Sequence, residues 1–485
     1  MSGDNINIRH RDRLFIDGQW VAASGDGRIQ LVDPATEEPF TSVAEAREAD
    51  MDRAVDAARR AFDSGPWPRM SHLERGSVVA ALAKKLEARH GELAAAWTRQ
   101  MGGLASFAPN VTMGGTFQLG YFAGLAATYP FETQQPASMG PGRAIIVREP
   151  VGVVAAITPW NAPYAIMTQK IAPALVAGCT VIMKPAPETP LEAYIIAECA
   201  AEAGLPPGVL NLVPAQRAAA DHLVCNPGVD KVAFTGSTAA GRRIASVCGE
   251  RIARVTLELG GKSAALVLDD FPIEQAAGIL TGTICTMSGQ VCATLSRVIV
   301  ARHRYAQLAE AIVAAMAGIK VGDPHDPASQ MGPLAMQRQL ERVQGYVAKG
   351  REQGATLACG GRQPAHLPRG YYFEPTLFTN VDNRMVIAQE EIFGPVISLI
   401  ACEDEADAIR IANDSIYGLN GAVFTPDPEK AYRVARRLRT GCVGQSGLRM
   451  DFMAPYGGFK QSGIGREGGP ENFQAFTETK TILTD

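Results

Sequence analysis

From about residue 151 the chain alternates short apolar runs with helical segments, and this alternation limits its possible folds more than any other feature. Each run with its following helix is roughly 25 to 30 residues long, as expected for a β-strand and a helical crossover. The predicted strands of this series are 151–157, 180–183, 209–213, 231–234 and 255–257. Helices ending near Gly178 and Gly204 fit the glycine that often follows a helix. The pattern therefore predicts an α/β fold with a parallel, doubly wound sheet.

A second alternating series follows and predicts a second α/β domain. Its apolar runs are 264–268 and 298–300, and it continues past Pro395 to 421–424. A chain of 485 residues is also longer than one hydrophobic core usually supports. At least two domains are therefore expected.

The segments outside these two series carry their own signals. The first region is expected to be helical, with Asp50 as the cap of one helix and Ser71 with Glu74 as the capping box of the next. Two β-prone pieces, 143–148 and 479–483, fit neither sheet. They are expected to pair with each other or with another subunit.

Composition excludes several classes of protein. The chain has 46 Lys+Arg against 50 Asp+Glu and a net charge of −4, so nothing indicates a nucleic-acid partner. The start of the sequence lacks a signal-peptide pattern and no apolar run is long enough to cross a bilayer, which predicts no membrane partner and a cytoplasmic location. The nine cysteines are scattered singly, so reduced thiols and no metal site are expected.

Polar segments follow the predicted strands of the first series. Ligands of open α/β sheets bind beyond the carboxyl ends of the strands, so these segments are expected to line one crevice. They are residues 158–161, 184–190, 235–241 and 258–262. Gly236 and Ser237 open a helix whose free N–H groups could face a dinucleotide diphosphate, although an ordinary strand-to-helix turn would look the same.

Two phosphate-binding patterns are rejected. Residues 463–468 spell Gly-x-Gly-x-x-Gly, but no strand precedes them and no crossover unit surrounds them. Residues 261–263 imitate the end of a phosphate loop, but Thr256 stands where the loop needs its first glycine. Neither segment predicts a nucleotide site.

Three side chains together form a candidate catalytic set. Cys292 lies in a predicted loop, where exposure and a helix end could lower the thiol pKa and supply thiolate, whereas most free cysteines are buried hydrophobes. Glu258 ends an apolar strand and precedes two glycines that allow close approach, so its pKa should rise and suit a general base, unless it is a paired structural carboxylate. Asn161 could donate to an oxyanion or could cap the next helix.

These segments resemble the aldehyde dehydrogenase superfamily over nearly the whole chain. The match comprises seven stretches in sequence order, more than chance would give. They are 159–161, 184–190, 234–238, 258–262, 289–292, 390–395 and 455–463.

The resemblance implies a domain layout. A Rossmann-like NAD(P)-binding domain would comprise residues 1–126 and 149–259. A catalytic domain would comprise 260–452, and a small β oligomerisation arm would comprise 127–148 and 470–485. A homodimer or homotetramer is the implied assembly.

The resemblance also implies the chemistry, which is NAD(P)-dependent oxidation of an aldehyde to a carboxylic acid. Cys292 would form the thiohemiacetal and thioester, Asn161 and the Cys292 backbone N–H would hold the oxyanion, and Glu258 would activate the hydrolytic water. Lys170 and Glu467 match positions of a proton relay. The implied cofactor-binding residues are Ile157, Thr158, Pro159, Trp160, Lys184, Gly236, Ser237, Leu259, Gly260, Glu391 and Phe393.

The chain departs from the family pattern at several positions. Pro187 replaces an acid that pairs with the ribose hydroxyls in many NAD-preferring relatives, so that contact is missing. NAD is the favoured cofactor, and NADP stays open. Gln216 near the adenine pocket and Gln445 near the substrate entrance are further departures. Six residues are candidates for an apolar substrate entrance: Phe117, Tyr121, Trp160, Tyr164, Met450 and Phe452.

Two alternatives stay open at this point. A CoA-acylating semialdehyde dehydrogenase would keep Cys292 but would not need Glu258 for deacylation. A non-catalytic binding relative would bind cofactor without thiol-dependent turnover. The identity of the aldehyde is not encoded in any motif of the sequence.

Overall fold

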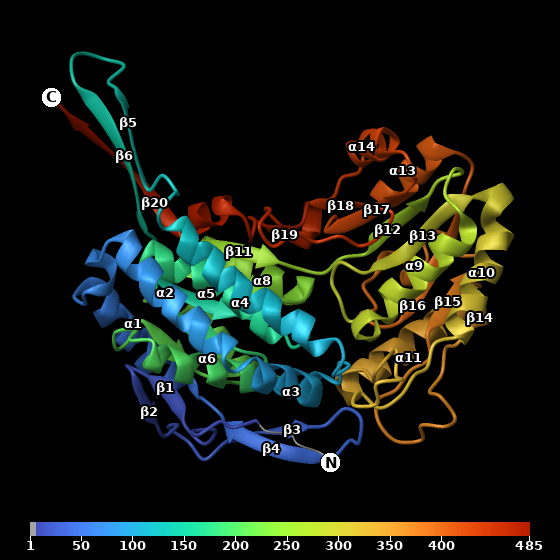
Figure 1. The fold of residues 1–485 in the computed structure, drawn as a ribbon, viewed down its shortest axis with the longest axis horizontal. Helices are drawn as coiled ribbons and strands as arrows, with labels where there is room; N and C mark the ends of the chain where they lie inside the picture. Colours follow the sequence, from blue (N-terminus) through green and yellow to red (C-terminus); the bar gives the residue numbers. More distant parts are fainter. Residues whose placement is uncertain (1–5) are drawn as a thin grey trace.

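The computed structural model describes residues 6–485 as two α/β units side by side with a β arm projecting from them (Figure 1). The first unit contains an eight-stranded sheet in the order β19-β11-β10-β7-β8-β9-β1-β2. Its five central strands are parallel, and the strands at both edges are antiparallel. The strands are β1 (Leu14–Ile16), β2 (Gln19–Val21), β7 (Val153–Ile157), β8 (Thr180–Lys184), β9 (Leu210–Leu212), β10 (Lys231–Thr235), β11 (Arg254–Glu258) and β19 (Gly463–Ile464).

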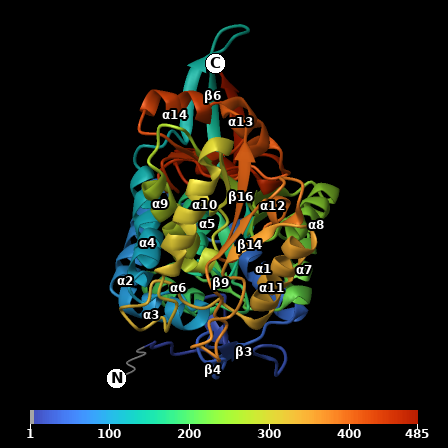
Figure 2. The same cartoon turned by 90° about the vertical axis from the view of Figure 1, so that its right-hand side faces the viewer.

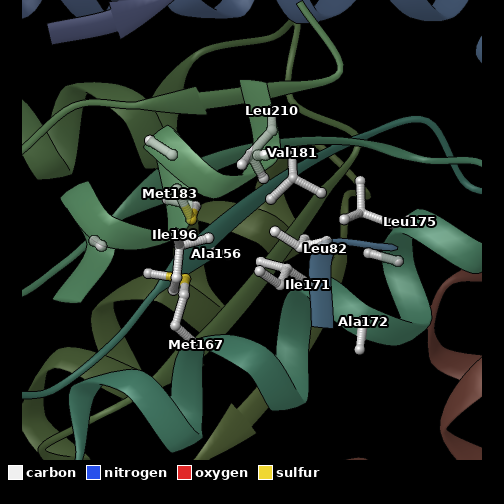
Figure 3. Packing of buried hydrophobic residues seen from close by; sticks show 14 of the residues in the cluster. Leu82, Ala156, Met167, Ile171, Ala172, Leu175, Val181, Met183, Ile196 and Leu210 are labelled. Atoms are coloured by element: carbon white, nitrogen blue, oxygen red, sulfur yellow. The ribbon is translucent and has the colours of Figure 1, made fainter. Parts of the chain in front are cut away.

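Helices cover both faces of this sheet because its central strands are apolar on both sides. In β7, Val154 and Ala156 face one helical layer, which Figure 3 shows around Ile171 and Ile196. The alternate residues of β7 pack with the helices of the other layer. The helices of the unit are α1 (Glu48–Asp63), α2 (His72–Glu87), α3 (His90–Met101), α4 (Ala108–Leu125), α5 (Pro163–Ala177), α6 (Leu191–Glu202), α7 (Arg217–Cys225) and α8 (Thr238–Glu250).

The second unit is built on a seven-stranded sheet in the order β14-β15-β16-β13-β12-β17-β18. All pairs except β14–β15 are parallel. The strands are β12 (Ser263–Val267), β13 (Leu295–Ala301), β14 (Thr356–Cys359), β15 (Thr376–Thr379), β16 (Val396–Cys402), β17 (Asn420–Phe424) and β18 (Cys442–Gln445). The helices are α9 (Ile273–Cys285), α10 (Tyr305–Ala317), α11 (Gln337–Glu352), α12 (Val386–Gln389), α13 (Glu405–Asn413) and α14 (Pro428–Ala435).

The projecting arm is a three-stranded antiparallel sheet. It comprises β5 (Glu132–Pro136), β6 (Arg143–Pro150) and β20 (Thr477–Thr484), with β6 in the centre. The two β-prone pieces left over from the sequence thus pair with each other. The hairpin of β3 (Arg28–Val32) and β4 (Pro39–Ala44) lies at the opposite end of the molecule (Figure 2).

The predicted α/β class, the strand series and one helix cap are confirmed. Ser71 caps α2: its hydroxyl accepts from the Glu74 N–H at 3.3 Å, and the Glu74 carboxylate accepts from the Ser71 N–H at 2.7 Å. The predicted cap at Asp50 is wrong, because α1 already begins at Glu48. The Asp50 carboxylate instead accepts from the Arg47 N–H at 2.9 Å, so it caps from inside the first turn. Within residues 6–485, no helix has the length and apolarity needed to cross a membrane.

Candidate active site

Cys292 lies in a tightly folded loop between α9 and β13. Met287 and Ser288 adopt positive φ angles of 52° and 55°, which side chains other than glycine rarely adopt. The loop is held in this form by the Ser288 hydroxyl, which donates to the Gly332 carbonyl at 2.8 Å. Gln290 also accepts from the Ala335 N–H at 3.0 Å through its side chain. The thiol therefore projects from a fixed backbone.

The two glycines after Glu258 let this loop approach. A Cβ atom at Gly261 would lie 2.4 Å from the Cys292 carbonyl oxygen, and one at Gly260 would lie 2.4 Å from a carboxylate oxygen of Glu391. Both distances are far below van der Waals contact, so a side chain at Gly261 would clash with backbone and one at Gly260 would displace the Glu391 carboxylate. The sequence-based expectation of a close approach at these glycines is confirmed.

Asn161 connects the carboxyl end of β7 to the same loop. Its side-chain amide donates one N–H to the Gln290 backbone carbonyl at 2.9 Å. The backbone carbonyl of Asn161 accepts from the Trp97 indole N–H at 2.9 Å. The amide carries a second N–H that this bond does not use. Asn161 is therefore fixed next to the cysteine loop with donor capacity left over.

Two cavities meet at these three groups. The first, of about 390 Å³, runs along the carboxyl edge of the first sheet toward α11. The second, of about 380 Å³, opens on the side of α4 and the segment 448–456. The residues that line both are Asn161, Ile166, Thr235, Glu258, Leu259 and Cys292. We call the first the cofactor-side cleft and the second the substrate-side cavity.

Glu258 is buried at this junction. Neither of its carboxylate oxygens has a hydrogen-bond partner in the described part of the chain. Burial raises the pKa of Glu258 well above its usual range, and the negative charge of Glu467 raises it further. The expected upward shift is thus found, and the oxygens remain available to a water or a substrate.

The Cys292 thiol does not have the lowered pKa expected from its loop position. Burial raises its pKa to about 12, with further contributions from the charges of Glu391 and Glu258. The expectation failed because the sulfur is buried and lies near two carboxylates instead of being exposed at a positive helix end. The Tyr456 hydroxyl, 4.0 Å from the sulfur, lowers the Cys292 pKa, but by less than burial raises it.

Lys170 and Glu467 form a fully buried ion pair beside the junction. The Lys170 ammonium also donates to the Thr235 hydroxyl at 2.7 Å. Glu467 pairs with Tyr456 through two backbone hydrogen bonds of 2.6 and 2.8 Å. Because Thr235 lines both cavities and Glu467 lines the substrate-side cavity, these polar groups extend from the interior to the site.

Most of the expected cofactor residues lie on the cofactor-side cleft. They are Pro159, Trp160, Gly236, Ser237, Leu259, Gly260, Glu391 and Phe393. Three others, Ile157, Thr158 and Lys184, are buried and do not line it. Burial lowers the pKa of Lys184 to about 8. Ser237 caps the 13-residue helix α8, so the free N–H groups of its first turn face an anion site of the kind that suits a diphosphate.

Several lining residues were not singled out in the sequence. Tyr456 lies in 455–463, one of the seven stretches that carry the family resemblance. Arg338, Gln339 and Arg342 belong to α11, which no motif marked. Gln339 donates to the Phe393 carbonyl at 2.7 Å and Arg342 to the Ile392 carbonyl at 3.2 Å. Their spacing on one helix face was the only available signal, and any solvated helix shares it.

Of the six candidates for the substrate entrance, Met450 and Phe452 line the substrate-side cavity. Trp160 lies in the cofactor-side cleft, edge-on to Phe393 at 5.3 Å between ring centroids. Tyr164 is core, and Phe117 and Tyr121 line neither cavity. Further apolar lining includes five residues that were not predicted as substrate contacts: Phe107, Val111, Met287, Val291 and Leu448.

The two unexplained glutamines take part in local structure. Gln445 donates to the Thr425 carbonyl at 3.1 Å and does not line the substrate-side cavity. Gln216 occupies the position before the first residue of α7. Neither contacts the junction at Cys292.

Comparison with known proteins gives a consistent set of matches. The sequence model of the aldehyde dehydrogenase family matches residues 20–482. A geranial dehydrogenase of Castellaniella defragrans is 43% identical over 478 residues, which cover 98% of this chain and 99% of that protein.

Solved structures agree in fold. An aldehyde dehydrogenase of Mycobacterium tuberculosis complexed with NAD⁺ has a TM-score of 0.95 at 44% identity, and the match covers 98% of each chain. A cysteine-to-alanine mutant of a Pseudomonas syringae aldehyde dehydrogenase, with NAD⁺ and octanal, has a TM-score of 0.94 at 39% identity, covering 99% of this chain and 98% of that one.

Proposed function

Because the chain belongs to the aldehyde dehydrogenase family and oxidises an aldehyde with NAD(P), we propose which of its residues carry that reaction. Cys292 is the nucleophile, Asn161 the oxyanion donor and Glu258 the base. The observation that carries the proposal is that these three side chains line both cavities. Side chains at this junction can therefore contact both a cofactor in the cofactor-side cleft and a substrate in the substrate-side cavity.

The thiol must lose its proton before it attacks. Since burial raises the Cys292 pKa, forming the thiolate needs a local proton acceptor, and Glu258 is one of two carboxyl groups, with Glu391, whose charge acts on the sulfur. In the proposed step the proton passes from Cys292 to the Glu258 carboxylate while the sulfur bonds to the aldehyde carbon. The second side-chain N–H of Asn161 then stabilises the resulting oxyanion.

Oxidation and hydrolysis complete the cycle. A nicotinamide held in the cleft would supply the acceptor for the hydride that leaves the thiohemiacetal carbon, so that a thioester on Cys292 results. Glu258, once deprotonated, takes a proton from water as the water oxygen bonds to the thioester carbon, and the C–S bond then breaks to give the carboxylic acid and the Cys292 thiolate. Lys170 and Glu467 would carry the proton away, a role supported by their ion pair and by the hydrogen bond from Lys170 to Thr235 at the junction.

The cofactor-side cleft suits a dinucleotide. We place the diphosphate at Gly236 and Ser237, where α8 begins, and the nicotinamide against Glu391 and Phe393 near Cys292. NAD is the proposed main cofactor. The first unit would then be the cofactor domain and the second the catalytic domain, with the boundaries expected from the sequence.

The substrate-side cavity indicates an apolar aldehyde. Its lining is largely aliphatic and aromatic, and no lysine or arginine among residues 6–485 lines it. An anionic substrate would therefore lack a counter-charge there. The octanal and geranial of the relatives' names are aldehydes of this class.

The experiment that tests this proposal is NAD(P)H formation with aliphatic aldehydes of increasing chain length. Rates should rise with apolar chain length and should be low for aldehydes that carry a carboxylate. The released product should be the free acid. Formation of acyl-CoA when CoA is added, with turnover independent of Glu258, would support the CoA-acylating alternative and contradict the hydrolytic role.

We also propose an assembly and a location. The arm of β5, β6 and β20 has a free edge at β5 that could extend the sheet of another copy, so a homodimer or homotetramer is proposed. Light scattering of the full chain tests this. A cytoplasmic location is supported by nine unpaired cysteines and stays a prediction.

A further inference from the structure

Tyr456 places a phenol hydroxyl beside the sulfur of Cys292. The hydroxyl oxygen lies 4.0 Å from the sulfur, which is long for an O–H···S hydrogen bond to a neutral thiol. Tyr456 lines the substrate-side cavity and not the cofactor-side cleft, whereas Cys292 lines both. The hydroxyl therefore meets the sulfur from the substrate side and leaves the sulfur accessible from the cleft proposed for the nicotinamide.

The backbone of Tyr456 is fixed by its neighbours. Its N–H donates to the Glu467 carbonyl at 2.6 Å, and its carbonyl accepts from the Glu467 N–H at 2.8 Å. The Glu467 carboxylate is in turn held by the buried Lys170. The next residue, Gly457, passes close to the proposed base, since a Cβ atom there would lie 2.6 Å from a carboxylate oxygen of Glu258. A small rotation of the Tyr456 side chain is thus enough to shorten its contact with the sulfur.

The Tyr456 hydroxyl is suited to be a hydrogen-bond donor and not a base. Burial raises its pKa well above its usual range, and the charges of Cys292 and Glu258 raise it further. It therefore keeps its proton at neutral pH. Neither oxygen of Glu258 has a hydrogen-bond partner in the described part of the chain, so the hydroxyl is not engaged by that carboxylate.

A thiolate at this position needs a donor. Burial and the charges of Glu391 and Glu258 oppose a negative charge on the sulfur. A carboxylate can take the thiol proton but cannot donate to the anion that remains, whereas a phenol can. Two groups that do lower the Cys292 pKa are the Tyr456 hydroxyl and the backbone of Ala293. Hydrogen bonds to ionised groups are shorter and stronger than neutral ones, so the Tyr456 contact should tighten once the sulfur is charged.

We propose that Tyr456 is a further catalytic residue, whose hydroxyl donates a hydrogen bond to the Cys292 thiolate. The bond forms when Glu258 takes the thiol proton, and it forms again when the thioester C–S bond breaks and the sulfur leaves as thiolate. Tyr456 keeps its own proton throughout, so the proton count of the cycle does not change. The inference rests on the proposed role of Cys292 as the nucleophile.

The rate at which iodoacetamide alkylates Cys292 tests the inference without turnover. The reagent reacts with thiolate, and mass spectrometry of the digested full chain quantifies the modified Cys292 peptide. Y456F keeps the ring and removes the hydroxyl, so at neutral pH the rate should fall about tenfold as the thiol pKa rises by about one unit. Y432F, at a tyrosine of α14 that is 62% exposed, is the matched control and should leave the rate unchanged.

Two other roles of Tyr456 predict different alkylation rates. A ring that only fills space would give an unchanged or faster rate in Y456F, because the variant slightly widens the cavity. A hydroxyl that binds the oxyanion of the aldehyde would lower kcat but leave alkylation unchanged, because alkylation forms no oxyanion. Either result would overturn the inference.

Steady-state kinetics give a second measurement. Y456F should lower kcat for octanal about tenfold and leave the KM values for octanal and NAD⁺ nearly unchanged, because the lost bond is to the sulfur and not to a bound ligand. A raised KM with an unchanged kcat would contradict the proposed role. Turnover that survives in C292A would instead overturn the nucleophile, and the alkylation rates would still show whether the hydroxyl acts on the sulfur, so the two failures are distinguishable.

Discussion

The two cavities that meet at Cys292 are similar in volume but differ in the charged groups on their walls. The cofactor-side cleft is lined by the start of α8, by the arginines of α11 and by Glu391. The substrate-side cavity is lined mainly by aliphatic and aromatic side chains. Arginines and a helix start suit a dinucleotide diphosphate and a wall without lysine or arginine among residues 6–485 suits a hydrocarbon chain, which is the basis for the proposed sides of cofactor and substrate.

The strongest test of this comparison is removal of the shared nucleophile. C292A should lower turnover by about 10⁴-fold or more, because no thiohemiacetal can form. NAD⁺ binding should persist, since the cofactor-side cleft keeps its other walls. C225A, at an exposed cysteine outside both cavities, should retain normal activity. Turnover that survives in C292A would show that the junction is not the reaction centre.

Glu258 offers the next largest effect. E258Q should lower kcat by about 10²- to 10⁴-fold because the thioester would be hydrolysed by a water that no general base activates. Stopped-flow absorbance should then show either a burst of NAD(P)H followed by slow turnover, if the base acts in hydrolysis alone, or no burst, if it also accepts the thiol proton. Steady-state rates equal to those of the unaltered chain would exclude both roles.

The apolar side can be widened selectively. F452A should raise the KM for octanal about tenfold through loss of apolar contact and should affect acetaldehyde little. F117A removes an aromatic ring that is 55% exposed and lines neither cavity, so it is the matched control. An equal rise in KM for both aldehydes in F452A would indicate a collapsed cavity and not a lost contact.

The smallest expected effect is a shift in the pH profile. Glu258 is active as a carboxylate, and its pKa is raised, so the rate should rise as the pH increases through that pKa. Glu467 raises the Glu258 pKa and Lys170 lowers it. E467Q should therefore move the rising limb of kcat to lower pH, and K170M should move it to higher pH.

The two opposite shifts make this measurement discriminating. E250Q, at an exposed position, removes the same charge as E467Q far from Glu258 and should leave the profile in place. Thermal melts show whether each buried variant is folded. Shifts in the same direction for E467Q and K170M would contradict an electrostatic origin.

Much of this architecture could be predicted because its signals are local. Apolar runs of strand length with helical crossovers predicted both sheets, and Ser71 with Glu74 predicted a helix start. Asp50 was misplaced because a carboxylate can cap a helix from outside or from within its first turn, and the sequence looks the same in both cases.

Other features could not be predicted because they depend on distant segments. Arg338 has no local mark, and its ion pair with Glu188 exists only because the fold brings α11 against the loop after β8. The predicted direction of the Cys292 pKa shift was wrong for a related reason. Residue type gives a thiol its reactivity, but burial and the charges of Glu391 and Glu258 decide its proton affinity.

The sequence by itself determined the α/β class, the family and the identities of the cysteine, the carboxylate and the amide, because these depend on residue type and spacing along the chain. Only the tertiary structure decided that these groups separate a cleft with arginines on its wall from a cavity that no lysine or arginine of the described chain lines. Cavity walls are assembled from many segments, and the desolvation and charges that set pKa values act through space.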